Sequence, residues 1–335
     1  MAPVPPTAPL APVLTHDSRY YFQEGNIVIR VEDVLFRVHS SILIQDSSIF
    51  ESMISLPQLD IGASSAEGAS DKNPIVLDGE TVVRLRALLW ALYALPHEIA
   101  QLYTPEADID LLVNIASMAH KYTFEKVESW AADLVMAKIQ SPAEHRIPAG
   151  YDFFPMMRYT GLSRKFALRQ RILDIFRKSF TCDTTDFARI IRFVHEDSDG
   201  SWDDLLGLTL YQYVIRGPQR WEADGDKLPR DKRVLLYIAF GNLCEMRMLG
   251  VPWEHIPNCA NTGKCIGEFQ ERLKCSSCVS GYKGAQGDFV AWTNRVALVH
   301  PPNGTSCLDA GMRAMQAQAR KLEEHAWMFF SELKC

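Results

Sequence analysis

The chain has 335 residues, of which 47% are hydrophobic and 23% are charged, a composition typical of a globular protein. This length is enough for about two domains, each able to bury its own core. The formal net charge of −6 argues against a protein built around a basic nucleic-acid-binding surface.

The first sixteen residues contain five prolines and no Lys, Arg, Asp or Glu. We expect residues 1–16 to form a disordered, proline-rich tail, because they can bury too little apolar surface to fold. The tail lacks the positively charged start of a signal peptide, and no later apolar stretch is long enough to span a bilayer. The sequence therefore predicts an intracellular protein that does not enter a membrane and that resides in the cytoplasm or the nucleus.

Residues 17–140 show a mixed α/β pattern. The β-branched runs at residues 26–31 and 34–38 predict two strands joined by a two-residue turn, and a short third strand is expected at residues 74–77. Apolar residues recur with helical spacing in four further segments, and the sequence predicts helices at residues 39–53, 81–95, 109–120 and 125–139.

Within this pattern, a set of residues recurs in a characteristic order and spacing. The set consists of Phe36, Val38, His39, Leu43, Ser47, Phe50, Met53, Leu89, Tyr93, Ala116, Tyr122 and Phe124. It resembles the signature of the BTB/POZ domain and covers about residues 17–140, in a form similar to the large group of BTB proteins found in fungi. The resemblance implies an α+β fold for this part of the chain, a small sheet flanked by helices.

The resemblance also implies a function. BTB domains generally bind other proteins: they self-associate, and they often dock onto a cullin scaffold or a transcriptional partner without catalysing a reaction. We therefore expect a homodimer and a role in protein–protein interaction. The signature residues are interpreted as core residues, each contributing roughly 1.5–3 kcal/mol through burial, and His39 as a hydrogen-bonded residue at a helix start.

Five residues are candidates for the dimer interface. Tyr20, Tyr21 and Phe22 are apolar and adjoin the first predicted strand. Asn26 and Ser40 occupy the positions where transcription-factor BTB domains commonly carry an acidic and a basic residue. Because both are neutral here, the resemblance implies that the charged pocket of those domains is absent, which argues against a corepressor groove of the transcription-factor kind.

Two alternative functions remain open. The first is that of a substrate adaptor for a cullin-based ubiquitin ligase, although residues 56–58 depart from the hydrophobic-x-acidic motif that the family uses for docking. The second is that of a chromatin or transcription regulator, using a basic segment at residues 158–178 and a zinc site. Apolar residues interleave with the seven cations of that segment, so a solvated helix face is the simpler interpretation.

Residues 141–335 are predicted to form a mainly α-helical C-terminal domain. Helical periodicity recurs at residues 158–180, 185–195, 202–213, 231–249 and 309–333. The segment 252–302 is rich in Gly, Cys, Asn and Pro, and we expect it to be irregular.

Four cysteines lie within 20 residues of that segment: Cys259, Cys265, Cys275 and Cys278. Zinc requires four soft ligands in a tetrahedral arrangement, and a Cys-x2-Cys pair such as the last two supplies two of them. The sequence therefore indicates a structural zinc site, with His255, His300 and Cys307 as further candidate ligands. The alternative is a set of free cysteines that pack as small apolar residues.

No catalytic motif is recognisable. The sequence contains no phosphate-binding loop, no Gly-x-Ser-x-Gly elbow and no His-Glu-x-x-His pair. We therefore expect a protein that is not an enzyme and that has no catalytic residues.

Overall fold

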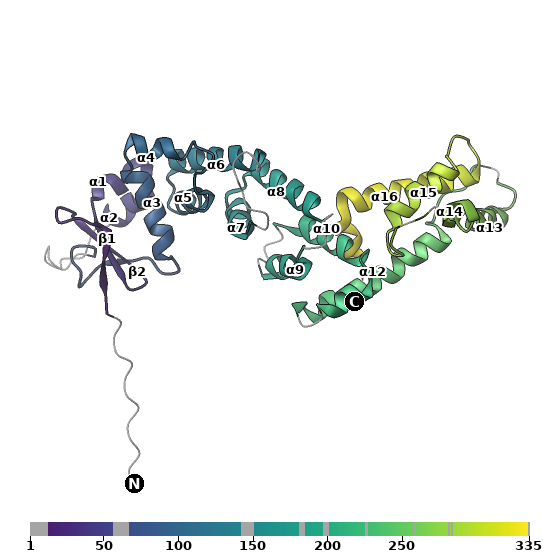
Figure 1. The fold of residues 1–335 in the computed structure, drawn as a ribbon, viewed down its shortest axis with the longest axis horizontal. Coiled ribbons are helices and arrows are strands. Elements are labelled where there is room, and N and C mark those ends of the chain that lie inside the picture. The colour runs from purple at the N-terminus through teal and green to yellow at the C-terminus, as the bar shows by residue number, and fades with distance from the viewer. Residues whose placement is uncertain are drawn as a thin grey trace, which may run out of the picture. The chain divides into compact units, whose positions relative to one another are not determined.

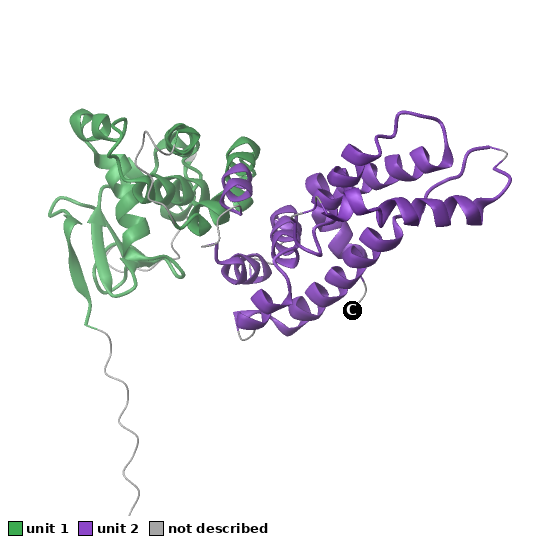
Figure 2. Ribbon diagram, turned by 45° about the vertical axis from the view of Figure 1, so that its right-hand side comes forward, with its two compact units in different colours: residues 1–172 green, residues 173–335 purple. Residues whose placement is uncertain are grey.

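The computed structural model describes residues 13–55, 67–141, 151–180, 185–196, 201–224, 227–257, 259–280, 282 and 284–333. The chain divides into two compact units, residues 1–172 and 173–335 (Figure 2). The expected α+β class is confirmed, because a small sheet lies near the N-terminus and most of the remaining described residues are helical. The division falls inside helix α8 (Phe166–Ser179), downstream of residue 140, where we expected the first domain to end.

The sheet of the first unit has four strands in the order β1-β3-β2-β4 (Figure 1). Strands β2 (Ile27–Val31) and β3 (Val34–Val38) form the predicted antiparallel hairpin, in which Val31 faces Val34 across a two-residue turn. Strand β4 (Ile75–Val76) pairs in parallel with β2.

Strand β1 (Thr15–Tyr21) was not predicted, and it pairs in parallel with β3 at the other edge of the sheet. The expectation of a disordered tail through residue 16 is therefore wrong for its last residues, and residues 1–12 lie outside the described part. The sequence pattern does not predict this strand, because most of its residues are polar or charged. Asp17, which is buried within it, accepts hydrogen bonds from the backbone N–H groups of Arg19 and Tyr20 at 2.9 and 2.8 Å.

The remaining elements of the first unit are helical. They are α1 (Ser40–Leu43), a 3₁₀ turn (Gln45–Ser47), α2 (Ile49–Ser55), α3 (Val82–Tyr93), α4 (Pro96–Gln101), α5 (Ile109–Lys121), α6 (Glu125–Gln140) and α7 (Phe154–Ser163). The single helix expected at residues 39–53 is wrong, because Asp46 adopts a φ of 62° and interrupts it. The helices at 81–95, 109–120 and 125–139 agree with the prediction to within about two residues at each end.

The regular elements described in the second unit, besides the end of α8, are helices joined by irregular segments. The helices are α9 (Phe187–Glu196), α10 (Asp203–Val214), α11 (Pro218–Ala223), α12 (Arg230–Leu249), α13 (Thr262–Leu273), α14 (Ser276–Ser280), α15 (Phe289–Val299) and α16 (Cys307–Glu332). Helices α10 and α16 approach closely at Gly207, where a Cβ atom would lie 2.1 Å from the backbone nitrogen of Trp327. Only glycine permits this contact.

The expectation that residues 252–302 are irregular is wrong, because α13, α14 and α15 lie within them. The side chains of Asn261 and Asp288 cap α13 and α15 by accepting hydrogen bonds from backbone N–H groups. Buried residues then recur with helical spacing, as Phe269 and Leu273 do on α13. Among the described glycines of the segment, Gly284 and Gly287 lie between α14 and α15, whereas Gly263 and Gly267 lie within α13.

The basic segment at residues 158–178 is not one continuous helix. Arg164 adopts a left-handed conformation with a φ of 53° and separates α7 from α8. Arg171 donates hydrogen bonds from its guanidinium group to the backbone carbonyls of Ile139 and Gln140 at 2.8 and 2.9 Å. The prediction of a single amphipathic helix is therefore wrong. Among the described helices, none is both long and apolar enough to cross a membrane.

Candidate functional site

The signature residues of the first unit lie together in its core. Of the eleven whose side chains are described, eight are buried: Phe36, Val38, Leu43, Phe50, Leu89, Ala116, Tyr122 and Phe124. Met53 and Tyr93 are half-buried against the same core. The signature residues of β3, α1, α2 and α3 thus share one apolar cluster with Tyr122 and Phe124. Ser47 lies in the 3₁₀ turn, and its side chain is outside the described residues.

His39 and Tyr93 form a direct link between the end of β3 and helix α3. The backbone N–H of His39 donates to the Tyr93 hydroxyl at 2.9 Å, and the His39 Nδ1 lies 3.0 Å from the same oxygen. The phenol oxygen therefore satisfies both the backbone and the ring of His39 at the point where the sheet leads into α1. This is the hydrogen-bonded role at a helix start that the sequence predicts for His39.

The interface candidates occupy different environments. Tyr20 is buried in the unit's own core at 3% exposure, which corrects its assignment to a docking surface. Tyr21 is half-buried, stacks on His16 and donates from its hydroxyl to Asp71 Oδ1 at 2.7 Å. Phe22 is also half-buried, between the core and the rings of His39 and Tyr93. Tyr21 and Phe22 retain exposed surface.

Asn26 and Ser40 pair with each other. The Asn26 amide donates to Ser40 Oγ at 2.8 Å, and the backbone N–H of Ser40 donates to Asn26 Oδ1 at 2.8 Å. Two neutral side chains thus satisfy each other's hydrogen-bonding groups. Neither residue carries an unpaired charge that would need a partner.

The cysteines of the second unit form two groups instead of the single four-cysteine site that the sequence indicates. One group consists of His255, Cys259, Cys265 and Cys307, and the other of Cys275, Cys278 and His300. The ligand atoms within each group lie within 4.8 Å of one another, so each group could hold a metal ion. The prediction that Cys259, Cys265, Cys275 and Cys278 share one ion is therefore wrong.

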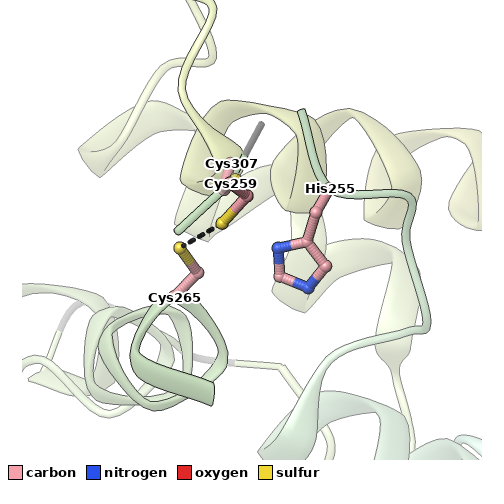
Figure 3. A group of neighbouring side chains, drawn as sticks. All are labelled: His255, Cys259, Cys265 and Cys307. Carbon is pink, nitrogen blue, oxygen red and sulfur yellow. Dashed lines mark hydrogen bonds between the residues drawn. The ribbon is translucent and has the colours of Figure 1, made fainter. Parts of the chain in front are cut away.

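Three segments of the chain position the first group (Figure 3). His255 and Cys259 lie in the irregular segment after α12, where the N–H of Cys259 donates to the carbonyl of Ile256 at 3.1 Å. Cys265 lies in the first turn of α13, and Cys307 is the first residue of α16. Figure 3 shows Cys265 pointing from its helix toward Cys259.

The distance between two sulphurs of this group is close to that expected around a tetrahedral zinc ion. The Sγ atoms of Cys259 and Cys265 are 3.6 Å apart. Zinc–sulphur bonds of about 2.3 Å at tetrahedral angles place two sulphurs about 3.8 Å apart. Three thiols and one imidazole are also among the combinations that hold structural zinc.

The imidazole of His255 is the fourth member of the group. Its Nδ1 atom is buried without a hydrogen-bond partner, and Figure 3 shows one nitrogen of the ring turned toward the thiols. A buried nitrogen without a partner is costly, and coordination to a metal ion removes that cost. The ring packs beside Trp253, with centroids 5.4 Å apart, which fixes its orientation.

Local hydrogen bonds prepare one thiol to act as a ligand. The backbone N–H of Asn261 donates to Cys259 Sγ and, with the thiols of Cys265 and Cys307, lowers the pKa of Cys259. The hydrogen bond between the Cys259 and Cys265 sulphurs, together with burial, raises the pKa of Cys265 to about 11. Without a cation, ionisation of one thiol makes ionisation of its neighbour less favourable. A bound dication stabilises several thiolates at once.

The second group lies around the short helix α14. Cys275 Sγ is 2.9 Å from Cys278 Sγ and 3.3 Å from His300 Nε2. Burial raises the pKa of Cys278 to about 12, and the same effect, together with the nearby Arg272, lowers the pKa of His300. The Cys-x2-Cys spacing was visible in the sequence, but His300 and Cys307 join their groups only through helix packing.

Compared with protein-family models, curated proteins and solved structures, the chain finds no match.

Proposed function

We propose that the protein is a non-catalytic interaction protein whose first unit is a BTB/POZ-type module that assembles with a second copy of itself. The observation that carries the proposal is the placement of the signature residues. Most of them belong to one apolar cluster, and His39 is hydrogen-bonded to Tyr93 where β3 leads into the helices.

The edge of the sheet supports homotypic assembly. Strand β1 is one of the two edge strands and pairs only with β3 among the described strands. An edge strand presents backbone donors and acceptors to a further strand. At the end of this strand, the aromatic side chains of Tyr21 and Phe22 are only half-buried. A second copy could use both the strand edge and these rings.

Light scattering on the full chain tests the proposal. A dimer has twice the chain mass of 37.9 kDa. We expect Ser18→Lys to weaken it, because Ser18 is exposed on β1 and a lysine opposes edge pairing, whereas Ser18→Ala leaves the mass unchanged. A mass of 37.9 kDa throughout the micromolar range contradicts the proposal.

The second unit, we propose further, is stabilised by a structural Zn²⁺ ion held by His255, Cys259, Cys265 and Cys307. The convergence of these ligand atoms from three segments favours this assignment. The ion would join the segment after α12 to the first turns of α13 and α16. In this role it has no catalytic function, because all four positions are filled by protein ligands.

Two alternative functions have their own tests. A cullin adaptor would bind a cullin N-terminal domain in a pull-down, and the residues that differ from the docking motif, 56–58, lie outside the described part. A chromatin regulator would bind DNA with an affinity that falls steeply with salt. The interrupted basic segment and the inward hydrogen bonds of Arg171 make the second alternative the weaker one.

A further inference from the structure

A second group of ligands lies apart from the site described above, at the other end of helix α13. Cys265 is in the first turn of α13, whereas Cys275 follows its last residue by two positions. Cys278 lies in α14, and His300 directly follows α15. The two groups share no residue, so each can be tested without the other.

The backbone holds Cys275 and Cys278 in a compact turn. The N–H of Cys278 donates to the carbonyl of Cys275 at 3.0 Å and lies 3.3 Å from its Sγ, while the N–H of Val279 also donates to that carbonyl at 3.1 Å. An N–H group directed at a sulphur favours the thiolate form that binds metals. This pair therefore has the backbone geometry that a Cys-x2-Cys ligand pair requires.

The third ligand is held against this turn by helix α15. The Arg295 guanidinium on α15 donates to the carbonyl of Ser277, between the two cysteines, at 2.6 Å. His300 lies just beyond the end of the same helix, and its N–H donates to the carbonyl of Val296 at 2.8 Å. These contacts bring His300 Nε2 to 3.3 Å from Cys275 Sγ.

We propose that Cys275, Cys278 and His300 bind a second Zn²⁺ ion whose fourth coordination position is occupied by water. Two thiolates balance the charge of the dication, and imidazole supplies a third soft ligand. Cys278 is buried, whereas Cys275 and His300 are only half-buried. Solvent therefore reaches the side of the group formed by these two residues.

The ion requires one small adjustment. A tetrahedral zinc ion holds two sulphurs about 3.8 Å apart, compared with 2.9 Å between Cys275 and Cys278. Cys275 is half-buried, so rotation of its side chain can move its sulphur outward while Cys278 stays in place.

Metal content per chain is the first test. Elemental analysis of the full chain, purified with zinc and then desalted, is expected to give two zinc ions per chain. His300→Ala and Cys275→Ser should each lose one ion, Cys265→Ser should lose the other, and a double variant of both sites should retain none. Cys244→Ser is the matched control, since this half-buried thiol belongs to neither group.

Cobalt substitution tests the open position. In the Cys265→Ser chain loaded with Co²⁺, added imidazole should shift the visible spectrum, because it replaces water at the second site. In the His300→Ala chain, which retains only the closed first site, the spectrum should not change. Equal responses in both chains would contradict the open position.

Thiol alkylation of the wild-type chain avoids any dependence on variants that fail to fold. Zinc should slow the alkylation of Cys275 and Cys278 several-fold, and a chelator should restore their rates. The proposal is overturned if one zinc ion is bound and His300→Ala leaves it in place. It is also overturned if zinc does not change the rates of these two cysteines, or if they are recovered as a disulfide from protein purified under reducing conditions.

Discussion

Phe269 of α13 packs directly over Gly311 of α16, where a Cβ atom would lie only 3.0 Å from the aromatic ring. Each of these residues lies one helical turn after a cysteine of the first metal group, Phe269 after Cys265 and Gly311 after Cys307. The contact between ring and glycine therefore brings the two helices close enough for their cysteines to meet.

A larger residue at this contact should separate the helices. We expect Gly311→Leu to lower the free energy of unfolding by about 1–3 kcal/mol, because it overpacks a buried site, and to reduce zinc binding at the first site. Urea unfolding and elemental analysis measure the two effects. Gly267→Ala on α13 is the control, since no atom lies within 4 Å of its Cβ. This control should keep the zinc and gain about 0.5–1 kcal/mol.

Removal of zinc should destabilise the second unit. A ligand that binds only the folded state at 100 times its dissociation constant contributes about 2.7 kcal/mol. A chelator should therefore lower the melting temperature of the wild-type chain by several degrees, and by less in Cys265→Ser. Cys244→Ser should show the full wild-type shift. An unchanged melting temperature after complete removal of zinc would argue against a structural role.

The link between His39 and Tyr93 can be removed with little change in volume. Tyr93→Phe takes away the hydroxyl that accepts from the His39 backbone, and we expect a loss of about 1 kcal/mol of stability. Tyr103→Phe is a suitable control, because its hydroxyl accepts from Trp130 at an exposed position. Equal unfolding free energies of the two variants would contradict the assigned role of Tyr93.

Asp17 should make the first unit sensitive to acid. Burial raises the pKa of its carboxyl group, but the N–H groups of Tyr20 and Arg19 and the Arg86 guanidinium outweigh burial and hold the pKa below its ordinary value of 3.8. The ionised carboxylate therefore stabilises the folded chain at pH values above the pKa that Asp17 has in the unfolded chain. This contribution is lost as the pH falls through the lower pKa of Asp17 in the folded chain.

Asp17→Asn should therefore lower the free energy of unfolding at neutral pH by about 1–3 kcal/mol. In this variant the free energy of unfolding should also fall less steeply than in the wild type below pH 3.8. Urea unfolding at pH 7 and near pH 3 measures both effects. Asp33→Asn is the control, because Asp33 is largely exposed and lies 3.7 Å from Arg30. A variant at Asp17 that loses as much stability at low pH as at neutral pH contradicts this assignment.

Local patterns predicted the long helices and the β2–β3 hairpin, because periodic apolar residues define which face each element buries. The same reasoning missed β1, whose exposed residues are polar and whose buried Asp17 is satisfied by its own backbone and by Arg86. It also missed α13, α14 and α15, where glycines and cysteines suggested an irregular segment. The caps at Asn261 and Asp288 start α13 and α15.

By itself, the sequence determined the class of the fold, the positions of most helices and the presence of cysteines able to bind a metal. Only the tertiary structure decided which of these cysteines share a site. Cys307 lies 42 positions beyond Cys265 in the chain, yet both belong to one group, whereas Cys275, ten positions away, belongs to another. Ligand grouping depends on how helices pack, and that packing is set by contacts such as Phe269 on Gly311, which no local spacing records.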